Sequence, residues 1–242
     1  MIFTTASGKP VPVRRARDLA SAPQAGGRSF SWSVHSLSGR LCELATEPGS
    51  PWLTLLCRLI LNAESAGEPT AWVTASRDTF YPPDFQANGV DLNSLPVVFA
   101  PDARRASRAT EHLLRSGAFS LVILQIDGQR LSNAILGRLS SLADQYNAGL
   151  LIVTSTPVRR LRAPAAYDTL GSLISLRMKC RVRQESAHQP YPNNELVYDA
   201  CNGTFVRPPQ GTFLCELTVT KDKRNGPGRV YREMCNGIAG MC

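Results

Sequence analysis

The stretch LCELATEPGSPWLTLLCRLI, residues 41–60, decides the fold of this chain. It begins with apolar residues typical of a buried strand, continues through a turn rich in Gly and Pro, and ends with apolar residues at helical spacing. A strand, a tight loop and a helix together form the frame of a phosphate-binding loop, whose pattern is G-x-x-x-x-G-K-[ST]. We therefore expect a strand around Leu41 and Leu44, and a helix from Pro51 to about Ser65.

The residues that bind phosphate in such a loop are missing from this frame. Trp52 and Leu53 stand where the Lys and the Ser or Thr would open the helix, and Pro51 replaces the preceding Gly. An indole has no ammonium group for the β- and γ-phosphates, and Leu53 has no hydroxyl for a magnesium ion. Pro51 also lacks an N–H donor of the kind that such loops direct at phosphate. The stretch predicts a nucleoside-triphosphatase fold that has lost its nucleotide.

Composition limits the class of protein. The 242 residues, 43% of them hydrophobic, suit one substantial α/β domain, and the formal net charge of +8 favours phosphate-rich partners. Seven Cys without a CxxC pair predict reduced structural thiols and no metal site. The N-terminus lacks a signal-peptide apolar region, and Arg58 interrupts the longest apolar run. We expect a cytoplasmic protein with no membrane contact.

The chain divides into an arm and a domain. Residues 1–31 are rich in Gly and Pro and contain Arg14, Arg15 and Arg17, which predicts a flexible basic arm followed by a domain over 32–242. Within the domain, residues 33–39 lead into the first strand, and the Pro-rich residues 76–88 are expected to be irregular.

Strands and helices alternate through the middle of the domain. We expect strands at 70–75, 95–99, 121–124 and 150–153, and helices at 103–116 and 131–146. This alternation predicts a parallel sheet with right-handed crossovers. After Gly171 the pattern changes to strands without helices, at 172–183, 196–202, 213–221 and 230–234. Antiparallel hairpins on the edge of a mixed sheet would account for these late strands.

The ordered segments resemble the RecA recombinase core over roughly 33–240. The resemblance rests on the strand Gly39–Leu44, on 89–95, on 113–118 with the Walker B strand 121–124, on 175–183, and on 218–223 with Val230. It implies a RecA-like α/β fold, with a mainly parallel central sheet flanked by helices and with C-terminal antiparallel edge strands.

The departures from RecA fall on its catalytic residues. Gln125 replaces the Walker B carboxylate and cannot organise magnesium as a carboxylate does, while Asp127 points to the opposite face if the strand continues. Ser76 or a neighbour replaces the catalytic Glu. Together with Pro51–Leu53, these losses predict that the protein is not an ATPase and needs no cofactor.

A short RecA-like chain without Walker motifs is similar to the ImuA family. That resemblance implies a non-catalytic accessory protein of SOS translesion synthesis, after DNA damage. Its implied partners are an ImuB-like inactive Y-family polymerase, RecA, DNA bound without sequence specificity, and further copies of itself. The alternative is a SulA-like division inhibitor that binds FtsZ, although such proteins are typically shorter and do not need so basic a surface.

Two basic segments and one tryptophan are candidate working surfaces. Arg159, Arg160 and Arg162 lie where the second DNA-binding loop of RecA would be, so they contact phosphate or form a solvated loop. Lys221, Lys223 and Arg224 occupy the Lys-x-Lys position that in RecA filaments reaches the ATP of the neighbouring subunit. They either contact the nucleotide of a RecA subunit or form an ordinary basic hairpin. Trp52 either fills the vacated phosphate pocket or anchors a partner.

Overall fold

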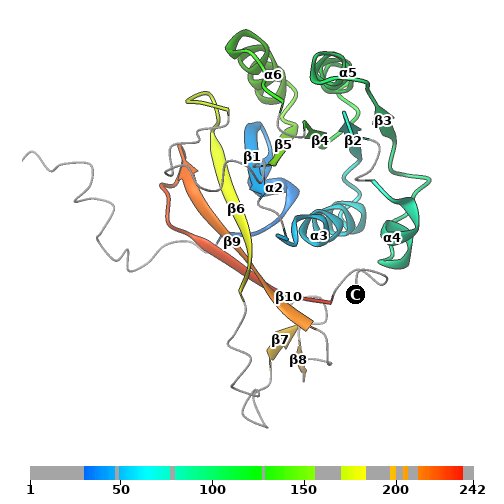
Figure 1. Ribbon diagram of the computed structural model, residues 1–242, viewed down its shortest axis with the longest axis vertical. Helices are drawn as coiled ribbons and strands as arrows, with labels where there is room; N and C mark the ends of the chain where they lie inside the picture. The colour runs from blue at the N-terminus through cyan, green and yellow to red at the C-terminus, as the bar shows by residue number, and fades with distance from the viewer. Residues whose placement is uncertain are drawn as a thin grey trace, which may run out of the picture.

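The computed structural model describes residues 30–46, 49–76, 80–126, 129–155, 170–183, 197–199, 204–206 and 212–236. Its main sheet has eight strands in the order β10-β9-β6-β1-β5-β4-β2-β3 (Figure 1). These strands are β1 (Arg40–Thr46), β2 (Thr70–Thr74), β3 (Val97–Phe99), β4 (Leu121–Gln125), β5 (Gly149–Ser155), β6 (Leu176–Arg183), β9 (Thr212–Asp222) and β10 (Val230–Asn236).

Neighbouring strands from β6 across to β3 pair in parallel, while β9 pairs antiparallel with β6 and β10 antiparallel with β9. The strand β1 is central, because its Leu44 lies beside Val153 of β5 on one side and Met178 of β6 on the other. The mainly parallel sheet and its antiparallel C-terminal edge are as predicted. The late strands β7 (Val197–Asp199) and β8 (Thr204–Val206) differ, since they form a separate two-stranded sheet.

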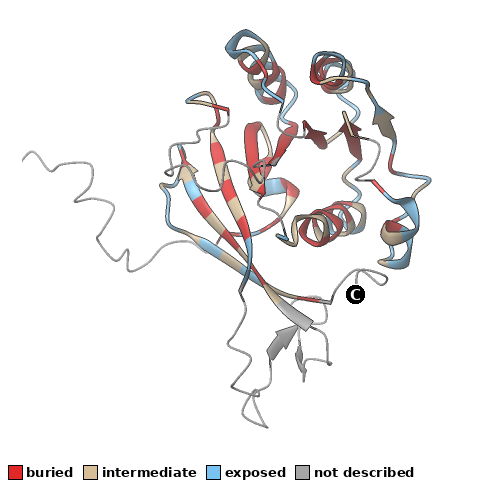
Figure 2. Ribbon diagram, viewed as in Figure 1, coloured by how far each residue is buried: buried red, intermediate tan, exposed pale blue. Residues whose placement is uncertain are grey.

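Helices cover both faces of the main sheet (Figure 1). On one face lie α2 (Val34–Leu37), α3 (Trp52–Ser65) and α4 (Pro82–Ala87), and on the other lie α5 (Ala103–Ser116) and α6 (Asn133–Gln145). Successive strand residues alternate between these layers, so that Cys42 and Leu44 pack in the first core and Leu41 in the second. Figure 2 shows the resulting burial of the central strands.

The Pro-rich segment 76–88 was wrongly expected to be irregular, and the segment that leads into β1 has a helix that the sequence did not indicate. Residues 33–39 contain the short helix α2, and the Pro-rich segment 76–88 contains α4. Pro82 and Pro83 are compatible with α4 because they occupy its first turn, where the missing N–H groups have no intrahelical partner. The helix buries Phe85, whose ring stacks on Phe80 and meets Trp72 edge-on, with 5.4 Å between the Phe85 and Trp72 ring centroids.

The N-terminal end of the described domain is anchored in the core. Phe30 is buried, although its position falls within the expected arm, and its ring lies under the guanidinium of Arg229. The indole N–H of Trp32 donates to the Leu55 carbonyl of α3 at 2.8 Å. The packing therefore extends slightly upstream of residue 32.

Candidate functional site

The carboxyl ends of β1, β5, β4 and β2 form the edge of the sheet where a nucleotide would bind. In open parallel sheets, ligands bind outside the carboxyl ends of the strands, beside the point where the strand order reverses. After β1 the chain continues to β2, which lies on one side of β1. After β5 it continues to β6, which lies on the other side of β1, so the strand order reverses between β1 and β5. The carboxyl ends of β1 and β4 lie at this edge, with β5 between them.

The start of α3 presents apolar side chains at this edge. Pro51 is the residue before the helix, and its side chain makes no capping hydrogen bond. Trp52 and Leu53, in the first turn, are partly buried and pack against the core under α3. Both roles predicted for Trp52, filling the expected phosphate pocket or anchoring a partner, stay predictions. Ser50 has a buried hydroxyl with no hydrogen-bond partner among the described residues.

Gln125 is held by the neighbouring strand. It ends β4, is buried, and its Oε1 lies 3.1 Å from the Thr74 hydroxyl of β2. The same hydroxyl accepts a hydrogen bond from the Ser76 N–H at 3.0 Å and lies 2.9 Å from the Ser76 carbonyl. The positions expected for the Walker B carboxylate and the catalytic Glu are therefore occupied by neutral residues, Gln125 and Ser76, that both bond to the Thr74 hydroxyl. Asp127 lies outside the described residues.

A buried ion pair next to this edge was not expected from the sequence. Glu43 of β1 is fully buried, accepts from Arg177 Nε of β6 at 2.6 Å, and accepts from the Thr154 hydroxyl of β5 at 3.1 Å. Arg177 also donates to the Gly171 carbonyl at 3.2 Å. The pair spans three adjacent strands and ties the segment before β6 to the sheet. A single Glu inside an apolar strand was the only sequence signal that could have indicated it.

The three C-terminal basic residues cluster at the opposite edge of the sheet. Lys221 Nζ lies 3.1 Å from the Ser172 carbonyl and Lys223 Nζ lies 3.4 Å from the Leu173 carbonyl. Arg224 donates to the carbonyls before β1, including that of Gly39 at 3.3 Å. In this chain these cations therefore stabilise the segments that precede β6 and β1.

A second buried charge network lies beside that cluster. The Asp222 carboxylate at the end of β9 accepts from Arg40 at 2.5 Å, from Arg229, and from the backbone N–H of Arg224 at 2.8 Å. Burial alone would raise the pKa of Asp222, but the hydrogen bond from Arg40 and the backbone donors outweigh burial and lower it. The carboxylate is therefore ionised at neutral pH and joins the hairpin to β1.

The described cysteines are free and buried. Burial raises the pKa of Cys42 to about 12 and that of Cys57 to about 11, so both thiols stay protonated at neutral pH. No group of three or more His, Cys, Asp or Glu residues in the described part of the chain is arranged to hold a metal ion.

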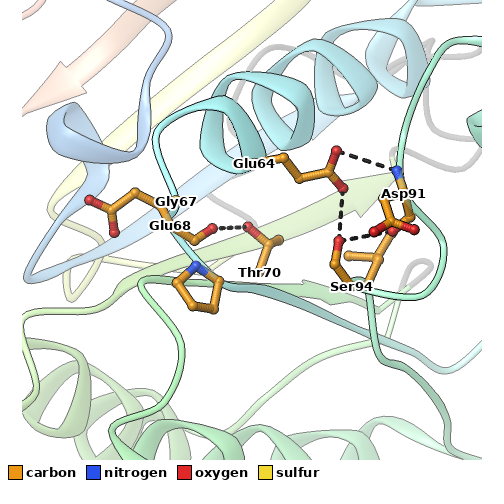
Figure 3. Close-up of a pocket in the computed structure, with 8 residues that line it drawn as sticks. Glu64, Gly67, Glu68, Thr70, Asp91 and Ser94 are labelled. Carbon is orange, nitrogen blue, oxygen red and sulfur yellow. Dashed lines mark hydrogen bonds between the residues drawn. The ribbon is translucent and has the colours of Figure 1, made fainter.

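A pocket of about 340 Å³ opens at the edge of the sheet away from the nucleotide position, between the end of α3 and the start of β2 (Figure 3). Glu64 accepts from the Asp91 N–H and the Ser94 hydroxyl, both at 3.3 Å, and Glu68 lines the same pocket. Figure 3 shows these bonds joining α3 to the segment before β3. We assign the carboxylate of Glu64 a structural role.

Arg159, Arg160 and Arg162 lie outside the described residues, so their predicted phosphate contact stays a prediction. Among the described helices, none combines the length and apolar character that a membrane crossing requires.

Comparison with known proteins identifies the fold. Searches against family descriptions and curated proteins give no match. Among solved structures, the RadB recombinase aligns with a TM-score of 0.54 and 14% identity over 81% of this chain and 87% of that chain. A KaiC-like protein from the archaeon Pyrococcus horikoshii OT3 aligns with a TM-score of 0.51 and 13% identity, over 81% and 85% of the two chains. The chain has a RecA-like fold, which confirms the predicted fold class.

Proposed function

We propose that this chain is a non-catalytic RecA-like accessory protein that acts by binding partners. The observation that carries the proposal is the chemistry at the carboxyl edge of the sheet. There, Trp52 and Leu53 open α3, and the Gln125 amide bonds to Thr74. Phosphoryl transfer depends on a cation at the phosphates and on carboxylate-held magnesium, and neither group is supplied by these side chains. The RecA-like framework then serves as a binding scaffold.

A thermal melt with and without ATP and magnesium tests the loss of nucleotide chemistry. A ligand at one hundred times its Kd stabilises a fold by about 2.7 kcal/mol, which corresponds to roughly 5–11 °C for a domain of this size. We expect no such shift in the melting temperature. A nucleotide-dependent rise of this size, or measurable ATP hydrolysis, would refute the proposal.

The process that we propose is translesion synthesis after DNA damage, as in the ImuA family. Support comes from the combination of a RecA-like fold, an edge without ATPase groups, and a net charge of +8. The proposed partners are an ImuB-like inactive polymerase, RecA and DNA. Pull-down of the purified protein with each partner, with RecA tested with and without ATP and single-stranded DNA, checks this assignment. Binding to FtsZ alone would instead indicate a division inhibitor.

The same pull-down tests the contact proposed for Lys221 and Lys223 with the nucleotide of a RecA subunit. Both ammonium groups bond to carbonyls of their own chain, so reaching a second molecule requires them to exchange these partners. Charge reversal at both positions is expected to weaken RecA binding in the presence of ATP. RecA binding that is unchanged by the reversal would remove this contact from the proposal.

A further inference from the structure

The outer face of α5 and α6 carries a cluster of arginines, which we call the α5–α6 basic face. Its members are the exposed residues Arg104, Arg105, Arg108 and Arg115 of α5 and Arg138 of α6. The opposite side of α5 packs on the sheet through buried residues such as Ala106 and Leu114. The two helices lie next to each other on the same side of the sheet (Figure 1). The arginines are therefore not needed to hold α5 on the sheet.

Helical spacing places the arginines of α5 in a row. Arg104 and Arg108 are one turn apart, and Arg115 follows two turns later on the same side. At 1.5 Å per residue the row extends over roughly 16 Å, a length that spans several phosphates of a nucleic-acid strand.

Ion pairs position part of this face without neutralising it. Glu111 has a side chain only 10% exposed and is shared by Arg138 at 3.1 Å and Arg115 at 3.8 Å. Two guanidinium groups on one carboxylate leave a net positive charge, and both arginine side chains stay about half exposed, at 49% and 55%. The carboxylate thus fixes one arginine of each helix at the junction of α5 and α6.

The N-terminal half of the face carries a larger charge excess. Asp102 caps α5 by accepting from the Arg105 N–H at 2.7 Å and lies 3.9 Å from its guanidinium. Arg104 and Arg108 form no ion pair with any residue in the part of the chain that the structure describes. The remaining acidic residue of the two helices, Asp144, lies near the far end of α6. Counting Asp102, Glu111 and Asp144, five guanidinium groups oppose three carboxylates.

The chemistry of the face identifies its partner. Guanidinium groups bind phosphate in a two-pronged geometry, and they are more weakly hydrated than ammonium groups, so less hydration energy is lost on contact. An acidic protein would need a buried apolar anchor at the centre of the contact, whereas the exposed residues of this face are polar or small there. At its end, Tyr146 follows α6, is 38% exposed, and lies against Gly117 after α5. An exposed ring beside a row of cations offers a stacking surface for an unpaired base.

We propose that the α5–α6 basic face binds single-stranded nucleic acid through its phosphates, without sequence specificity. This site uses helix-surface residues other than those at the strand ends where a nucleotide would bind and other than Arg159, Arg160 and Arg162. It needs no ATP. The proposal can therefore be tested independently of the ATPase and polymerase-partner assignments.

Fluorescence anisotropy with labelled single-stranded DNA, single-stranded RNA and duplex DNA tests the proposal across a range of salt concentrations. We expect the double variant Arg104→Gln/Arg108→Gln to bind single strands about 5- to 10-fold more weakly at low salt, since each exposed contact contributes a fraction of a kcal/mol to about 1 kcal/mol. The slope of log K against log salt should fall by roughly 1.4, which is 0.7 for each lost phosphate contact. Gln keeps the helix propensity of α5, and circular dichroism confirms that the variant is folded.

Two further variants test whether the binding is specific to this face: a charge-matched arginine pair elsewhere, and a change of the exposed tyrosine. Arg181→Gln/Arg232→Gln removes the same formal charge from exposed residues of β6 and β10, where Arg232 pairs with Glu216 at 2.9 Å, and should leave the salt slope unchanged. Tyr146→Ala should weaken single-strand binding more than duplex binding. Equal loss of binding in both arginine double variants would show general charge attraction and overturn the site. Wild-type binding by Arg104→Gln/Arg108→Gln, or tighter binding of duplex than of single strands by the unmodified protein, would also overturn it.

Discussion

Replacement of Asp222 by Asn tests the buried network that joins the C-terminal hairpin to β1. The Asp222 side chain is completely buried and pairs with two guanidinium groups, those of Arg40, whose own side chain is only 3% exposed, and Arg229, at 16%. Asn keeps the shape but removes the charge, so two guanidinium groups lose their carboxylate. Breaking a buried ion pair in this way typically costs about 3–5 kcal/mol, because an uncompensated charge is left inside the protein.

The loss should be visible in thermal and urea unfolding followed by circular dichroism. For a domain of this size each 1 kcal/mol shifts the melting temperature by about 2–4 °C, so Asp222→Asn should lower it by roughly 6–20 °C. Asp144→Asn, at an exposed carboxylate near the end of α6, is the control and should change stability by less than about 0.5 kcal/mol. A loss of unfolding free energy below about 1 kcal/mol for Asp222→Asn would refute the reasoning that the buried arginines depend on this carboxylate.

The pH dependence gives a second measure of the same network. Although burial raises the pKa of Asp222, hydrogen bonds from Arg40 and from the backbone lower it by more, so the folded-state pKa lies below the unfolded value. Its stabilisation is therefore present above the unfolded pKa of about 3.9 and is lost as pH falls through the lower folded-state pKa. In acid unfolding, Asp222→Asn should remove this component, so the stability difference from the unmodified protein should narrow below about pH 4.

Three further changes test other parts of the structure. Arg177→Met leaves the fully buried Glu43 without its cation and should cost about 3–5 kcal/mol in urea unfolding, whereas an unchanged midpoint would show that the pair is dispensable. Gly149→Ala places a Cβ 3.0 Å from the Leu37 Cβ and should cost about 1–3 kcal/mol by overpacking; a gain in stability would show that α2 moves freely. Phe85→Ala empties the aromatic cluster under α4 and should cost about 3–5 kcal/mol in the same assay, and a loss under 1 kcal/mol would mean that the site collapses around the gap.

Local sequence signals predicted most of the fold. The helix 103–116 was predicted with its bounds, and Gly117 adopts the left-handed conformation, φ 65°, that ends α5. The Asp102 cap at its start is seen in the structure. The local sequence pattern gave the wrong structure at 76–88. Proline is disfavoured inside a helix, but it is favoured in the first turn, where α4 has its prolines. The separate β7–β8 sheet was missed because hairpin patterns do not indicate which sheet a hairpin joins.

Some features of the candidate site can also be read from the sequence, and others are seen only in the structure. That Pro51, Trp52 and Leu53 do not match the phosphate-loop pattern can be read from the sequence, because a phosphate loop is a contiguous motif with fixed spacing. The sequence also shows that position 125 lacks a carboxylate. Only the structure shows that Gln125 bonds to Thr74, since these residues are brought together by adjacent strands of the sheet.

The sequence by itself determined the alternation of strands and helices through the middle of the domain and the residue types at the expected phosphate-loop positions, because each depends on neighbouring residues. The tertiary structure decided which distant charges meet. Glu43 pairs with Arg177, 134 positions away, and Arg40 with Asp222, 182 positions away. It also decided that arginines from α5 and α6 share Glu111. Such pairs depend on strand order, helix packing and register, which arise from burial of the whole core rather than from any local pattern.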